Sequence, residues 1–119
     1  PNRFRELAVA VTRHHLNCHK APHLKAATTL RLLQEIGALR DPVKLSCFVQ
    51  CCEADARGRL GFEQQPYTPG EWLRRACDAV REVSAGEFLQ QGLSGKQLGQ
   101  AIEKRRLAIL NNLREPCHR

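Results

Sequence analysis

The chain has 119 residues, of which 42% are hydrophobic, so it is long enough for one domain with a core of its own. Its 19 lysines and arginines outnumber its 12 acidic residues, and the net charge of +7 favours a polyanionic partner, nucleic acid before an anionic membrane. No apolar run approaches the roughly 20 residues of a membrane span, and the first residues do not have the pattern of a signal peptide.

The first half of the chain predicts three helices. The first covers 3–18 and places Phe4, Val11 and other apolar residues on one face. The second covers 25–36 and ends at Gly37, a residue typical of the position after a helix. The third covers 42–56 and is apolar on nearly every side, which predicts a central, buried helix. Asp41 and Pro42 form its start signal.

The second half predicts a polar loop over 57–67, a helix over 69–83, a short helix that Ser84 caps, and a last helix over 96–114. No strand-like alternation occurs. We therefore predict an all-α fold, a single domain of residues 1–119 in which five or six helices form a compact bundle around the buried helix near 42–56.

The six cysteines follow no zinc-binding spacing, since no CxxC pair occurs. Regular helices without a secretory signal argue against a disulfide scaffold, so we expect free thiols and a cytoplasmic protein. The chain starts at Pro1 and contains no methionine, which suggests a fragment of a longer protein.

Clustered histidines raise the possibility of a metal site at His14, His15 and His19. His15 falls in the middle of an apolar stripe, where a core histidine is the more common case. We predict no metal site. The alternative is that the chain is a remnant of a metal-dependent HD phosphohydrolase, with these three histidines as metal ligands.

A run of alternating acids and arginines follows the third predicted helix, with glycines at Gly58 and Gly61. Because residues two apart on a helix point in different directions, Glu53 and Asp55 are poorly placed to share a metal ion. We predict instead an ion-pair network. Its members are Glu53, Asp55, Arg57, Arg59 and Arg105.

Arg105 joins this network because it falls among the apolar residues of the last helix. An arginine there needs a carboxylate partner, and we expect Glu53 or Asp55. Loss of such a buried pair would cost about 3–5 kcal/mol.

Predicted exposed positions on the last helices carry several further basic residues. The turn before the last helix, with Gly95 and Lys96, can present free N–H groups and a cation to a phosphate, although an ordinary capped turn explains it equally well. With few aromatic residues nearby, we expect contact with the backbone of a folded RNA. The candidates are Arg74, Arg75, Arg81, Gly95, Lys96, Lys104, Arg106 and Arg114.

From the first predicted helix to about Arg114, the chain resembles the C-terminal region of bacterial tRNA nucleotidyltransferases, the CCA-adding enzymes that carry an HD domain. The best-matching stretch runs from Cys51 to Arg75. The matching motifs are Cys-Glu-Ala-Asp-Ala-Arg-Gly-Arg from Cys52, Gly-Phe-Glu from Gly61, Tyr67 and Trp-Leu-Arg from Trp72. The resemblance implies that 1–40 is the end of an HD-like region and 41–119 a C-terminal body and tail.

By the same resemblance, the parent enzyme adds or repairs the 3′-terminal CCA of tRNA with CTP and ATP as substrates and Mg²⁺ as cofactor. The family's catalytic motifs have no counterpart in this sequence, so no catalytic residue or cofactor is assigned to it. The expected role is tRNA binding away from the 3′ end, with the parent's N-terminal head and HD regions as further partners. A purely structural scaffold is the remaining alternative.

Overall fold

The structure is a computed structural model of the chain, and it describes residues 2–58, 61 and 64–114. These residues form six α-helices and one short 3₁₀ turn, without a strand among the described residues. The predicted all-α fold is confirmed. The elements are α1 (Asn2–His19), η1 (Ala21–His23), α2 (Ala26–Ile36), α3 (Pro42–Arg57), α4 (Thr68–Arg81), α5 (Ala85–Gln90) and α6 (Gly95–Leu113).

The helix ends follow the local signals. Gly37 adopts φ 83° directly after α2, a left-handed conformation that glycine reaches without strain. The side chain of Asp41 accepts a hydrogen bond of 3.0 Å from the backbone N–H of Val43 and so caps α3. Ser84 caps α5 in the same way through the N–H of Gly86, at 3.2 Å.

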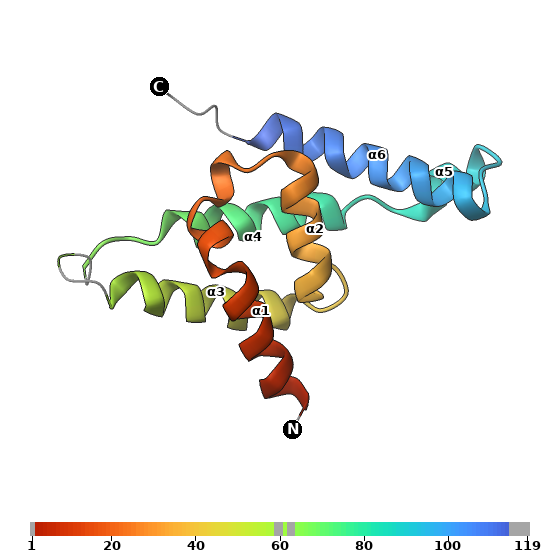
Figure 1. Ribbon diagram of the computed structural model, residues 1–119. Helices are drawn as coiled ribbons and strands as arrows, with labels where there is room; N and C mark the ends of the chain where they lie inside the picture. The colour runs from red at the N-terminus through yellow and green to blue at the C-terminus, as the bar shows by residue number, and fades with distance from the viewer. Residues whose placement is uncertain (1, 59–60, 62–63, 115–119) are drawn as a thin grey trace.

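The helices lie in two layers. In Figure 1, α3, α4 and α6 run side by side, and α1 and α2 lie across them. The molecule measures 55 × 43 × 18 Å along its principal axes. Since one helix with its side chains is about 10–12 Å across, every helix in two such layers keeps a face toward solvent.

One hydrophobic core joins the two layers. Phe48 of α3 and Leu73 of α4 are fully buried in it, together with Leu33 of α2. α6 contributes one fully buried residue, Leu110. Because residues from both sides of position 40 share this core, the HD-like and tail regions expected from the resemblance pack together; the boundary itself stays a prediction.

The helix predicted near 42–56 forms as α3, but it is buried on one side only, and not on all sides as expected. Of α3, only Leu45, Phe48, Val49 and Cys52 are buried, and Val43 is 66% exposed. The helix with the most central position is α4, which packs against α1, α3, α6 and η1. A thin two-layer structure leaves the second apolar face of α3 uncovered.

The C-terminal half of α6 is tied to the body, and its N-terminal half extends away from it with α5. The indole N–H of Trp72 donates to the carbonyl of Leu113 at 3.3 Å. Phe88 of α5 is buried but lies outside the main core. Figure 1 shows the α5–α6 hairpin projecting from the body on the right. None of the helices in the described part of the chain is long and apolar enough to cross a membrane.

Candidate nucleic-acid interface

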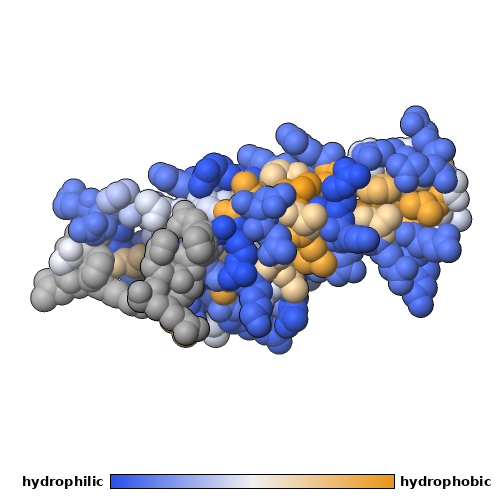
Figure 2. All heavy atoms as spheres, turned by 90° about the horizontal axis from the view of Figure 1, so that it is seen from above, coloured by the Kyte–Doolittle hydropathy of each residue, from blue (hydrophilic) through white to orange (hydrophobic). Residues whose placement is uncertain are grey.

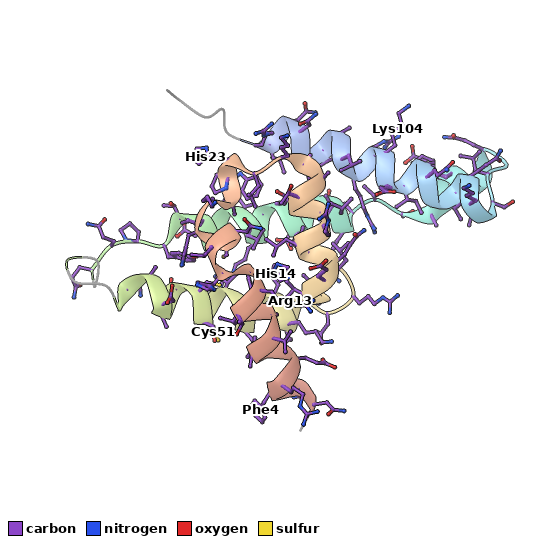
Figure 3. The ribbon with its side chains drawn as sticks, viewed as in Figure 1. Phe4, Arg13, His14, His23, Cys51 and Lys104 are labelled. Carbon is purple, nitrogen blue, oxygen red and sulfur yellow. The ribbon has the colours of Figure 1, made fainter. Side chains whose placement is uncertain are left out.

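One exposed face of α6 carries polar side chains over most of its length. Gln97, Gln100, Lys104 and Asn111 are all exposed and lie three, four or seven residues apart, so they share one side of the helix. Figure 3 shows Lys104 pointing away from the body. Seen from above, hydrophobic residues also reach the surface over α6, between hydrophilic ones (Figure 2). The three amides were not among the residues singled out from the sequence; their regular spacing was the available signal.

The α5–α6 turn presents the predicted glycine-rich element at the end of the hairpin. Gly92 and Gly95 both adopt positive φ, 87° and 54°. Gly95 and Lys96 are exposed, and apart from the adjoining backbone no described atom lies within 4 Å of the position a Cβ on Gly95 would occupy. The turn is therefore open to a ligand, and Lys96 stands beside it.

The arginines of α4 lie among acids. Arg74 and Arg75 are both exposed, but each has Glu71 and Asp78 one helical turn away. Lys96 and Lys104 differ, since no acidic residue lies three or four positions from either of them. The electrostatic attraction for a polyanion is therefore stronger on α6 than on α4.

Three other candidates hold the fold together. The guanidinium of Arg81 donates to the carbonyl of Leu39, that of Arg106 to Val80, and that of Arg114 to His23. These contacts measure 3.3, 3.3 and 3.1 Å, and they join α4 and α6 to neighbouring elements. Substitution of these arginines would disturb packing as well as charge, so they are poor reporters of RNA binding.

Of the predicted acid–arginine network, the Glu53–Arg57 pair forms among the described residues. Glu53 lies 3.5 Å from Arg57, one turn along α3, and the guanidinium of Arg57 also donates to the carbonyl of Gln65 at 3.3 Å. Asp55 lies 2.9 Å from His19 of α1. Arg59, with Phe62 and Glu63 of the resemblance, falls outside the described residues.

Arg105 was assigned to the wrong face of α6. Its side chain is 47% exposed and lies 3.1 Å from Glu87 of α5, with its guanidinium 5.4 Å from the centre of the Phe88 ring. The half-buried arginine is its neighbour Arg106. Leu110, the buried residue of α6, lies one helical turn from Arg106, so Arg106 is on the buried side of the helix and Arg105 points toward α5 and solvent instead of toward α3.

We therefore expect Arg105→Ala to lower the free energy of unfolding by only about 1 kcal/mol, as for exposed ion pairs and cation–π contacts. Urea denaturation of this variant and the wild type measures the difference. A loss of about 3–5 kcal/mol would show that Arg105 is a buried partner after all.

A chain of polar side chains runs from the surface into the core where α1, α3 and the start of α4 meet. The two ring nitrogens of His19 lie 2.9 Å from a carboxylate oxygen of Asp55 and 2.7 Å from the hydroxyl oxygen of Tyr67. Tyr67 donates a hydrogen bond to Cys18 at 3.3 Å. Burial of its phenol raises the pKa of Tyr67. A hydrogen bond to Cys18 raises the pKa of Cys52.

Raised pKa values keep Tyr67 and Cys52 protonated at neutral pH. The hydrogen bond with Cys52 lowers the pKa of Cys18. The chain connects α1 and α3 with the start of α4. The hydrogen-bonded pairs of this chain are 36 to 49 residues apart in the sequence, so no local spacing could have predicted them.

The histidines proposed as alternative metal ligands have other contacts. His14 lies 2.8 Å from Glu35 of α2, and His15 lies 2.9 Å from the carbonyl of Val11. Among residues 2–58, 61 and 64–114, no three His, Cys, Asp or Glu side chains come together as a metal-binding group. Cys18, Cys47, Cys51, Cys52 and Cys77 are free thiols.

Comparison with curated proteins gives matches over nearly the whole chain. The chain is 43% identical to the multifunctional CCA protein of Pseudomonas fluorescens over 115 residues, which is 97% of this chain and 28% of the relative. It is 44% identical to that of Methylococcus capsulatus and 37% identical to that of Hahella chejuensis, covering 96% and 97% of this chain and 27% of each relative.

The chain corresponds to a segment of multifunctional CCA proteins. The family resemblance seen in the sequence is thereby confirmed. The chain spans little more than a quarter of the length of these multifunctional CCA proteins. No protein-family model and no solved structure matches the chain.

Proposed function

We propose that residues 1–119 are the C-terminal, tRNA-binding part of a tRNA nucleotidyltransferase that adds or repairs the 3′-terminal CCA with CTP and ATP. The name of the relatives supports the parent activity. The observation that carries the binding role is the exposed face of α6, where Lys96 and Lys104 have no acidic neighbours one turn away.

The chemistry of this face suits an RNA backbone. Lysine ammonium groups attract phosphates, and the amides of Gln97, Gln100 and Asn111 can hydrogen-bond to phosphates and 2′-hydroxyls. The stretch from Gln97 to Asn111 is about 21 Å long at 1.5 Å per residue, enough to follow several nucleotides. Such contacts read shape and charge instead of base sequence.

In this proposal, nucleotidyl transfer takes place in the remaining part of the parent. Mg²⁺ would serve that step, and the described residues of this segment offer no group of three ligands for it. The segment contributes affinity for tRNA, and the parent's head and HD regions contribute the reaction. With a tRNA-processing role, we expect the protein in the cytoplasm.

Replacement of both Lys96 and Lys104 with Gln in the full-length parent should weaken tRNA binding at least roughly tenfold, because charge-assisted contacts are lost. The slope of log affinity against log salt should fall by about 2. A titration of labelled tRNA at several salt concentrations measures both quantities.

Glu103→Gln is the matched control, since it places the same side chain on the same helix but removes a negative charge. We expect it to bind tRNA as well as the wild type or more tightly. Lysine variants with wild-type affinity would show that α6 is not the binding surface.

A further inference from the structure

A groove opens between the N-terminal half of α1 and the start of α3. It encloses about 900 Å³, and its lining is mainly apolar. α1 contributes Phe4 and Val9, and α3 contributes Val43 and Cys47, while Ile36 and Gly37 at the end of α2 close one side. We call this surface the α1–α3 groove.

The groove gathers three of the exposed large hydrophobic residues of the described part of the chain. Five large hydrophobic side chains are prominently exposed among the described residues, and Phe4, Val9 and Val43 of these line the groove at 68%, 46% and 66% exposure. Figure 3 shows Phe4 at the projecting end of α1, away from α6. Contiguous exposed apolar surface of this kind marks a place where another surface packs.

The sequence of α3 supports the same conclusion. Its apolar residues surround the helix, which is the pattern of a helix covered on all sides. Only one side is covered here, and Val43 and Ala54 are exposed while Cys47 and Cys51 are half-buried. The uncovered side of α3 faces the groove at Val43 and Cys47.

The charges around the groove indicate what kind of surface would fit. Its acids are already engaged: Glu6 lies 3.6 Å from Lys44, Glu35 lies 2.8 Å from His14, and Asp41 caps α3. Arg3, Arg5 and Arg13 are exposed and form no ion pair with any described residue. The complementary surface is apolar in the middle and carries carboxylates at its edges.

We propose that the α1–α3 groove receives an amphipathic, acid-flanked helix from the remaining part of the parent chain. This segment spans 27–28% of its relatives, so most of the parent's residues lie elsewhere and one of its helices is the available partner. Phe4, at the outer end of the groove, and Lys104 of α6 lie at opposite ends of the view in Figure 3. The parent's other regions would thus dock on one side while tRNA binds on the other.

Cys47 provides the test, because it lines the groove and carries a free thiol. In the full-length parent, the rate of maleimide labelling at Cys47 is measured by mass spectrometry for the wild type, Val43→Asp and Leu89→Asp. We expect Val43→Asp to expel the docked helix and speed labelling at least tenfold. Leu89→Asp, at a site 53% exposed on α5, should leave the rate unchanged.

Two controls keep the result interpretable. Cys77 is buried in the core, so slow labelling there shows that the fold is intact; if Val43→Asp unfolds the segment, Val9→Asp carries the same test from α1. Equal labelling of Cys47 in the wild type and the folded variant would overturn the proposal. So would protection that requires tRNA, which indicates an RNA occupant, or protection lost on dilution, which indicates a second copy. None of these outcomes bears on tRNA binding by α6.

Discussion

Replacement of Phe48 with Ala should lower the free energy of unfolding of the segment by about 3–5 kcal/mol. Phe48 is fully buried in α3, within the core that α2, α3 and α4 share. Removal of its ring loses transfer free energy and leaves a cavity, which the surrounding helices fill only in part. Against a total stability of about 5–15 kcal/mol, this loss is large enough to unfold much of the protein at moderate urea concentrations.

Urea denaturation followed by circular dichroism measures the effect as a shift in midpoint. Val43→Ala, on the same helix at 66% exposure, is the matched control and should change stability by no more than about 0.5 kcal/mol. A Phe48→Ala variant within 1 kcal/mol of the wild type would contradict the packing of α3 described above.

Gly70→Ala should destabilise the protein by about 1–3 kcal/mol, although a glycine-to-alanine change inside a helix ordinarily stabilises it by about 1 kcal/mol. Gly70 lies in the first turn of α4, where this helix packs against Val49 of α3. An added Cβ would stand 2.6 Å from a methyl carbon of Val49 and 2.9 Å from a ring carbon of Tyr67. Both neighbours are buried, so relief of the overlap requires the two helices to separate.

Gly99→Ala tests the opposite sign in the same protein. Gly99 lies within α6, and apart from the backbone of its own helix no described atom comes within 4 Å of its added Cβ. We expect a stabilisation of about 0.5–1 kcal/mol from helix propensity alone. Thermal melts of the two variants should shift in opposite directions, and a stabilised Gly70→Ala variant would show that α3 and α4 are not packed as closely as the structure indicates.

The helix boundaries were predictable because the signals are local. Gly37 ends α2, Asp41 caps α3 and Ser84 caps α5 through residues next to them in the sequence. Each effect depends on the geometry of one helical turn and not on the rest of the fold.

The arrangement of the helices was harder to predict. An apolar pattern around α3 predicted complete burial, but a pattern does not say whether the covering surface belongs to the same chain segment. Arg105 shows a second limit. Neighbouring residues on a helix point about 100° apart, so an error of one position in the predicted buried face assigned to Arg105 the half-buried place that Arg106 occupies. The His19–Asp55–Tyr67 chain joins distant segments, and local periodicity carries no information about it.

Only the local features of the candidate site were predictable. Net charge and the position of Lys104 on an amphipathic helix follow from composition and periodicity. The use of Arg81, Arg106 and Arg114 in tertiary hydrogen bonds does not, because their acceptors are backbone carbonyls 26 to 91 residues away.

The measurement that tests the central claim most directly is a titration of residues 1–119 with labelled tRNA at two salt concentrations, with duplex DNA as competitor. We predict tRNA binding that weakens steeply as salt increases, because lysines of α6 release counterions from the phosphates. We also predict that duplex DNA competes poorly with tRNA for the segment. Binding that does not respond to salt, or no binding at low salt, would contradict a tRNA-binding role for this segment.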